Sequence, residues 1–178
     1  GWPWPASGVL AWSVRTTERL MLRALSLVIY AEDSYYDVLN AREKAIIVRN
    51  KHDAQLGSEL PFEVLERLKI SLSFLYSGTI AESWGIWRSL RFFDQLAEPL
   101  REQGYNPLLI IAGYAPDAQT LKRLRILTER RTDILLLGGE KPLAPELINA
   151  LIQASGFGMA FYENTPRLTQ KIPTKLYS

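Results

Sequence analysis

The sequence predicts an α/β fold with a doubly wound parallel sheet, and two observations lead to this prediction. From residue 70 onward, apolar stretches alternate with amphipathic ones, and the apolar stretches begin near residues 70, 107, 132 and 157. These intervals have the length that a parallel strand–helix–strand unit requires. The apolar stretches are also hydrophobic on both sides, which is typical of strands that helices cover on both faces.

Length and composition limit the class of protein. The chain has 178 residues, enough for one domain and part of a second. Hydrophobic residues make up 47% and charged residues 22%, which is ordinary for a globular fold and argues against disorder over most of the length. The formal net charge of +2 is made of mixed signs along the chain, so nucleic acid is not an expected partner.

Residue usage also bears on location and completeness. The absence of cysteine excludes disulfides, thiolate metal sites and cysteine nucleophiles, and it fits a cytoplasmic protein. The sequence contains neither an apolar run of about 18 residues, as a membrane span needs, nor a signal peptide. The chain begins with Gly1 instead of Met and ends inside a predicted helix, so we expect it to be a fragment.

Residues 1–50 predict the end of a first domain. The expected elements are a helix over 13–24, a strand over 25–31, a helix over 32–44 and a strand over 45–50. Residues 51–69 are polar, with turn signals at Gly57 and Pro61. We interpret this second stretch as a linker or surface excursion that can hold one short helix.

Residues 70–178 predict the doubly wound domain, truncated at its carboxyl end. The expected strands cover 70–78, 106–116, 132–142 and 156–163, and the expected helices cover 82–104, 117–130, 144–155 and the stretch from 171 onward. Gly104 is expected to end the first of these helices. Asp117 is expected to cap the second, because its carboxylate can accept hydrogen bonds from the first backbone N–H groups.

A ligand of such a sheet lies outside the carboxyl ends of the strands. Three of the four ends contain glycine, in "YSGT", "AGYAP" and "LGGEKP". Glycine lets backbone N–H groups approach an anion, and the following helices direct their positive N-termini to the same edge. The pattern favours a phosphate-bearing ligand, against the alternative that each glycine serves only its own turn.

Basic residues near this edge add positive charge, although lysine more commonly forms a solvated basic face. They are Lys141, Arg167, Lys171 and Lys175. The sequence lacks the residues that several other kinds of functional site require. His52 is the only histidine, which argues against zinc, and the signatures of a phosphate-binding loop, a dinucleotide fold and a hydrolase nucleophile are absent.

Several stretches together resemble one enzyme family. "FLYSGTIAESWGIW", "LLIIAGY" and "ILLLGGEKP" look like successive strands of a nucleotide-sugar-binding domain, and "FGMAFYENTPRLTQKIPTKLYS" looks like its later strand, loop and helix start. Upstream, "ERLMLRALSLVIYAEDSYYDVL" and "AIIVRNKHD" resemble the end of the N-terminal domain and the crossover between domains. The family is the GT-B glycosyltransferases, in the large retaining group often called family 4, whose domains are Rossmann-like.

The resemblance implies donor-binding residues at the motif positions. They are Ser77, Gly78, Thr79, Gly138, Gly139, Glu140, Lys175 and Ser178. The first three would lie near the diphosphate of a nucleotide-diphosphate sugar, and the next three near its base or ribose. Lys175 would face the phosphates or the start of the closing helix. No catalytic residue is assigned, because the acceptor-side base would precede Gly1.

The sequence departs from the family in two motifs. Relatives often carry two glutamates with seven residues between them, the second touching the ribose, and those positions are Gln170 and Ser178 here. Many relatives also carry Arg and Lys after the first glycine turn. This chain has Glu82 there, which can instead serve as a first-turn helix acid.

The implied function is transfer of a sugar from a UDP-, GDP- or similar nucleotide sugar to a glycan or lipid-linked acceptor, with no cofactor and no metal. The fragment is expected to be inactive alone. Peripheral association with the inner face of the membrane fits the acceptors common in the family. Two alternatives stay open: a nucleotide-sugar epimerase of the same fold, and a non-catalytic Rossmann-like binding module that binds no nucleotide.

Overall fold

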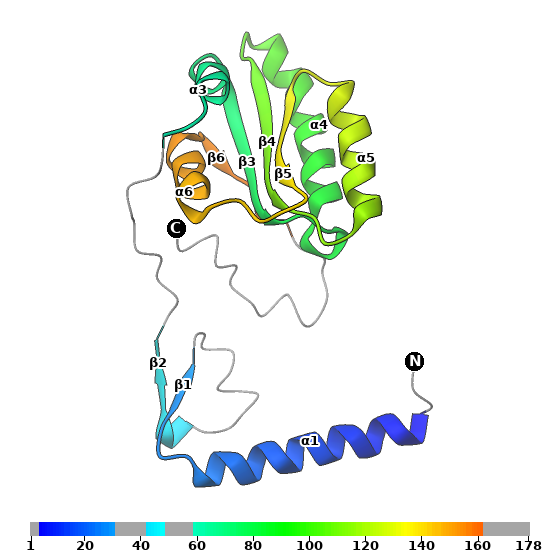
Figure 1. The fold of residues 1–178 in the computed structure, drawn as a ribbon, viewed down its shortest axis with the longest axis vertical. Coiled ribbons are helices and arrows are strands. Elements are labelled where there is room, and N and C mark those ends of the chain that lie inside the picture. The colour runs from blue at the N-terminus through cyan, green and yellow to red at the C-terminus, as the bar shows by residue number, and fades with distance from the viewer. Residues whose placement is uncertain (1–3, 31–41, 49–58, 162–178) are drawn as a thin grey trace. The chain divides into compact units, whose positions relative to one another are not determined.

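The computed structural model describes residues 4–30, 42–48 and 59–161. These residues divide into two compact units, one containing residues 4–30 and 42–48 and the other containing residues 59–161. Each unit has its own parallel sheet (Figure 1). The predicted boundaries at residues 50 and 70 stay predictions.

The second unit is built on a four-stranded parallel sheet in the order β5-β4-β3-β6. Its strands are β3 (Leu72–Thr79), β4 (Pro107–Tyr114), β5 (Ile134–Gly139) and β6 (Phe157–Gly158). The chain adds β4 and then β5 on one side of β3, and afterwards crosses to place β6 on the other side. The order therefore reverses between β3 and β6, as in a doubly wound sheet, and the predicted fold class is confirmed at this level.

Helices cover both faces of this sheet (Figure 1). α4 (Ile86–Glu102) and α5 (Ala118–Glu129) pack on one face, and α3 (Phe62–Lys69) and α6 (Pro145–Ala154) pack on the other. Successive residues of a strand point to opposite faces. Thus Phe74 belongs to the α4–α5 core and its neighbour Leu75 to the α3–α6 core.

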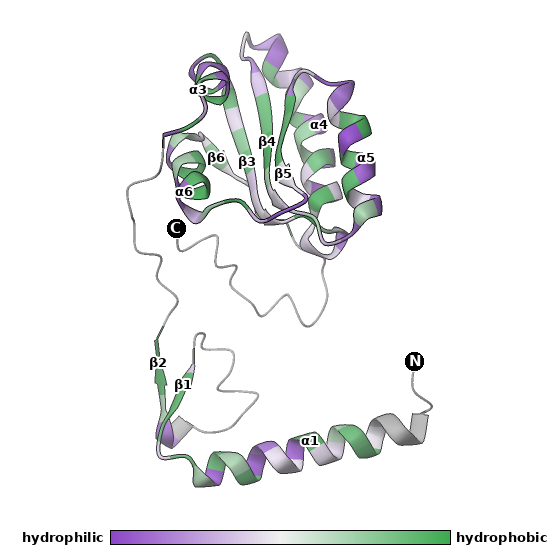
Figure 2. Ribbon diagram, in the orientation of Figure 1, coloured by the Kyte–Doolittle hydropathy of each residue, from purple (hydrophilic) through white to green (hydrophobic). Residues whose placement is uncertain are grey.

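The central strand explains the unbroken apolar pattern of the sequence. Residues Leu108 to Ile111 of β4 are each at most 2% exposed, because β3 and β5 flank them and helices cover both faces. Figure 2 shows apolar residues along the strands and polar residues on the outer sides of the helices. Burial on this scale is the main stabilising contribution to a domain of this kind.

Asp117 begins α5 and Gly104 ends α4, as the sequence predicts. The Asp117 side chain accepts hydrogen bonds from the backbone N–H groups of Gln119 and Thr120, so it caps α5. Gly104 follows α4 with a φ of 85°, and the N–H groups of Gly104 and Tyr105 return to the carbonyls of Arg101 and Leu100. This pair of bonds satisfies carbonyls that the end of the helix would otherwise leave without donors.

An ion-pair network lies near the start of β5. Asp133 accepts hydrogen bonds from Arg131 at 2.8 Å and 2.9 Å and also from Arg101, and Arg131 in turn contacts Asp94. The bond from Arg131 is the largest cause that lowers the pKa of Asp133, and that same bond raises the pKa of Arg131. The network joins α4 to the edge of the sheet opposite the carboxyl ends of the strands.

The first unit contains a helix and a small sheet. α1 (Trp4–Ala24) precedes β1 (Val28–Tyr30), which pairs in parallel with β2 (Ala45–Ile47) after the short 3₁₀ helix η1 (Arg42–Lys44). The Lys44 ammonium donates hydrogen bonds of 3.4 Å and 3.3 Å to the carbonyls of Arg23 and Leu25, which fixes the end of α1 near β2.

The elements differ from the predictions in several places. α1 begins nine residues earlier than the predicted helix over 13–24, and the strand predicted over 25–31 is limited to β1. The strand predicted over 45–50 is β2, which ends at Ile47. Within the helix predicted over 32–44, residues 31–41 lie outside the described residues and η1 is a 3₁₀ turn.

Two differences concern the large sheet. α3 buries Val64 and Leu68 against the sheet, so the helix within the predicted linker contributes to the core. The strand predicted over 156–163 is reduced to β6. Met159 still donates its N–H to the Leu75 carbonyl of β3 at 2.8 Å, and the ring of Phe161 then packs on Phe92 of α4 with centroids 4.9 Å apart; residues 162 and 163 lie outside the described residues.

Candidate functional site

The carboxyl edge of the four-stranded sheet carries a row of glycines. Gly78 of β3 pairs in register with Gly113 of β4, which pairs with Gly138 of β5. A Cβ atom on Gly113 would lie 1.8 Å from the Gly78 carbonyl oxygen, and one on Gly138 would lie 2.5 Å from the Gly113 carbonyl oxygen. No larger residue fits at Gly113 or Gly138 without displacement of backbone, so the row lets the three strand ends lie close together.

The turn between β3 and α4 is the part of the edge nearest to the reversal in strand order. After Thr79 it continues through Ile80, the 3₁₀ turn η2 (Glu82–Trp84) and Gly85 into α4. The backbone N–H groups of residues 81–83 donate to no described residue, and Glu82 and Ser83 are exposed. The turn therefore presents consecutive donors to a ligand at this edge.

A buried hydroxyl holds this turn from below. Tyr76 of β3 is fully buried, and its hydroxyl lies 2.7 Å from the carbonyl oxygen of Thr79 and 3.0 Å from that of Trp84. The two carbonyls stand on either side of the N–H groups just described. The sequence analysis did not select Tyr76, although a tyrosine inside an apolar strand is a signal, since a buried hydroxyl needs a partner.

The helix N-termini at this edge are not equivalent. Asp117 caps α5, and the hydrogen bond from the Thr120 hydroxyl at 2.6 Å is the largest cause that lowers the pKa of Asp117. Its carboxylate occupies the N–H groups that an anion would use. α4 and α6 begin at Gly85 and Ala144, which provide no side-chain cap. Of the three helices, α4 and α6 therefore keep positive ends without a side-chain cap, and at the start of α4 the Phe161 carbonyl lies against the buried Gly85.

The predicted residues on β5 lie apart from those on β3. Gly138 is exposed, whereas Gly139 is buried against Leu121 of α5. Glu140 accepts a hydrogen bond of 2.7 Å from Arg125, which holds its carboxylate beside α5. β4 lies between the two groups, so they are two strand spacings apart, or about 10 Å.

The end of β4 therefore lies between the two predicted groups. Tyr114 stands in register with Thr79 on one side and Gly139 on the other, and 38% of its surface is exposed. A ligand that contacted both groups would pass over Gly113 and Tyr114. The sequence analysis noted "AGYAP" as an edge segment but assigned it no role, because register is a property of the paired strands.

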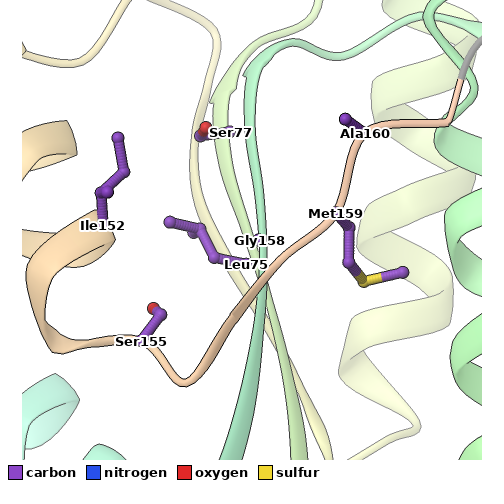
Figure 3. Close-up of a pocket in the computed structure, with 7 residues that line it drawn as sticks. All are labelled: Leu75, Ser77, Ile152, Ser155, Gly158, Met159 and Ala160. Carbon is purple, nitrogen blue, oxygen red and sulfur yellow. The ribbon is translucent and has the colours of Figure 1, made fainter. Parts of the chain in front are cut away.

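A pocket of about 100 Å³ opens between α6 and the adjoining strands β3 and β6 (Figure 3). Its lining includes Ser77, Leu75 and Ser155, and the Ser155 hydroxyl is buried with no hydrogen-bond partner among the described residues. Ser77 is 8% exposed, while Gly78 and Thr79 are exposed at the edge itself. The pocket has room for a few water molecules, so a ligand the size of a nucleotide sugar does not fit inside it.

The predicted residues are thus only partly brought together. Ser77, Gly78 and Thr79 form one group at the β3–β6 reversal, and Gly138, Gly139 and Glu140 form another at β5. Lys175, Ser178 and Gln170 lie outside the described residues, as do Arg167 and Lys171.

Within the part of the chain that the structure describes, no three acidic or histidine side chains gather as a metal site would need. The same residues contain no helix with the length and apolar character to cross a membrane. No protein-family model matches the chain, and no curated protein sequence matches it with significance.

Proposed function

We propose that this chain is the donor-binding part of a GT-B glycosyltransferase and that a nucleotide-diphosphate sugar binds at the carboxyl edge of its four-stranded sheet. One observation above all supports the proposal. The stretch "FLYSGTIAESWGIW" forms β3, the following turn and the start of α4, directly beside the reversal of strand order where doubly wound sheets bind ligands.

The chemistry of the edge suits a diphosphate. The turn offers the N–H groups of residues 81–83, and the uncapped end of α4 adds the positive end of a helix dipole. During sugar transfer the nucleoside diphosphate leaves with increasing negative charge, and fixed donors of this kind stabilise such charge. The absence of side chains at Gly78 and Gly138 leaves the backbone accessible to the ligand.

The proposed donor lies along the edge, with its diphosphate at β3 and its base or ribose at β5. Such a ligand would cross the end of β4 and pass close to Tyr114. The acceptor we propose is a glycan or a lipid-linked glycan, in a whole enzyme that works in the cytoplasm with peripheral membrane association.

A second candidate is a Rossmann-like module that binds no nucleotide. One observation favours it: residues 77–86 contain no basic side chain, and Glu82 places an exposed acid in the turn where a diphosphate would lie. An acid there repels a phosphate, and within residues 77–86 only backbone donors oppose that repulsion.

Titration calorimetry and thermal shift with UDP, GDP and their sugars distinguish the two. A nucleotide at 100 times its dissociation constant should stabilise the chain by about 2.7 kcal/mol. Absence of binding by every nucleotide would reject the transferase and support the binding module.

A pair of variants locates the site. Thr79→Asp adds a negative charge at the exposed end of β3 and should weaken diphosphate binding at least tenfold. Thr132→Asp is the matched control, because it adds the same charge at an exposed position before β5, at the opposite edge of the sheet, and should leave the affinity unchanged. Equal effects of the two changes would argue that the nucleotide binds elsewhere.

A further inference from the structure

We infer that Tyr76 is a positioning residue, whose hydroxyl fixes the β3–α4 turn in the conformation that receives the diphosphate. This inference rests on the proposed function. Tyr76 touches no ligand itself, since its side chain is fully buried beneath the edge. It acts through the backbone of the turn.

The geometry of the hydroxyl supports this role. It lies 2.7 Å from the Thr79 carbonyl oxygen and 3.0 Å from the Trp84 carbonyl oxygen. A tyrosine hydroxyl has a single hydrogen, so it donates to the two carbonyls as a shared bond. Thr79 is the last residue of β3 and Trp84 the last of η2, so one side chain joins both ends of the turn.

The other supports of the turn are backbone hydrogen bonds: the N–H groups of Trp84 and Gly85 donate to the carbonyls of Ala81 and Glu82 at 3.1 Å and 2.8 Å, and that of Ile86 donates to Ala81 at 3.4 Å. Ile80 is fully buried and donates its N–H to the Tyr114 carbonyl at 2.8 Å, which extends the pairing with β4 by one residue. Gly85 adopts a left-handed φ of 78° and receives no side-chain cap. Between these points, Glu82 and Ser83 are exposed, so Tyr76 supplies the hydrogen bond that spans this exposed part from the core.

The surroundings of Tyr76 make its position rigid. Its neighbours Phe74 and Ile86 belong to the same buried cluster, and both are at most 6% exposed. A hydroxyl on a ring packed in this way cannot follow the turn if the turn moves. The turn is therefore ordered before a ligand arrives, and the ligand does not lose affinity by ordering it.

Tyr76→Phe in the full chain tests the inference, because it removes the hydroxyl and keeps the packed ring. Hydrogen–deuterium exchange should become at least tenfold faster at the hydrogen-bonded N–H groups of residues 84–86 and stay unchanged at residues 108–111 of β4. The affinity for UDP or GDP, whichever the unmodified chain binds, should fall at least fivefold. Tyr105→Phe is the control: Tyr105 is 52% exposed, and its loss of a hydroxyl should change neither quantity.

Each outcome is decisive. Unchanged exchange at residues 84–86 would overturn the inference, and so would faster exchange with unchanged nucleotide affinity; in both cases the proposed function would stand. Failure of the unmodified chain to bind any nucleotide would reject the proposed function, and with it the role of Tyr76 in positioning a donor. Faster exchange together with weaker binding would support both.

Discussion

At the scale of the single residue, space decides what the edge can contain. The row formed by Gly78, Gly113 and Gly138 is a packing requirement first, because each strand end lies against the backbone of the next. A glycine at this edge can therefore be required by packing, by a ligand, or by both. A glycine that packing already requires is weaker support for a ligand than one that stands in open space.

Replacement of Gly113 by alanine should lower the free energy of unfolding by about 1–3 kcal/mol, because the added methyl group would meet the Gly78 carbonyl. Chemical denaturation of the full chain measures the loss. Gly158→Ala is the matched control, since its Cβ would meet no atom within 4 Å, and it should change stability by no more than about 0.5 kcal/mol. Equal losses in the two variants would contradict the close approach of β3 and β4.

At the scale of the element, the helix ends divide the edge into regions of different electrostatic character. Asp117 neutralises the start of α5, while α4 and α6 begin without side-chain caps. Anions are therefore favoured near the beginnings of α4 and α6. This agrees with the proposed place of the diphosphate and argues against a second phosphate site at α5.

Removal of the cap in Asp117→Ala should lower the thermal midpoint of unfolding, because the N–H groups of Gln119 and Thr120 lose their acceptor. Asp117→Asn should retain most of the stability, since an amide oxygen can accept the same bonds. Thermal unfolding of the two variants beside the unmodified chain gives the comparison. If Asp117→Asn lost as much stability as Asp117→Ala, the negative charge of Asp117 would matter more than its hydrogen bonds to the backbone.

At the scale of the whole molecule, the four-stranded unit combines two edges with different roles. The carboxyl edge presents backbone donors, and the opposite edge carries the network of Arg131, Asp133, Asp94 and Arg101. The network adds a pH-dependent contribution to stability. Because it lies far along the strands from the proposed site, that contribution can be altered separately from ligand binding.

Acidification should destabilise the fold through Asp133. Its pKa in the folded state lies below the ordinary value of 3.8, chiefly because Arg131 donates to it, so the folded state binds this proton less readily than the unfolded chain. The stabilisation by ionised Asp133 is therefore fully present above about pH 4, and it is lost as the pH falls through the lowered pKa that Asp133 has in the folded state.

Urea unfolding between pH 7 and pH 2.5 measures this dependence. At neutral pH, Asp133→Asn should lower the free energy of unfolding by about 1–2 kcal/mol. On acidification, the variant should lose less stability than the unmodified chain. Some dependence should remain, because hydrogen bonds also lower the pKa of Asp117. An unchanged slope in the variant would show that Asp133 does not carry the effect.

Sequence patterns predict this fold where the cause is local or repetitive. The strand positions follow from apolar runs, and the Asp117 cap and the Gly104 stop follow from neighbouring backbone groups. The register that aligns the glycines and the bond from Tyr76 to two carbonyls depend on how distant segments meet. The early end of β6 has a similar cause, since Phe161 packs on a residue of α4 that is far away in sequence.

The row of glycines has a consequence for protein engineering. A library that randomised the strand ends to alter ligand preference at the proposed site would lose most members that changed Gly113 or Gly138, because those members would misfold. Diversity is better introduced at Thr79, Tyr114 and Glu140, which are exposed neighbours of the row. Gly113 and Gly138 should therefore be kept, while Thr79, Tyr114 and Glu140 are varied.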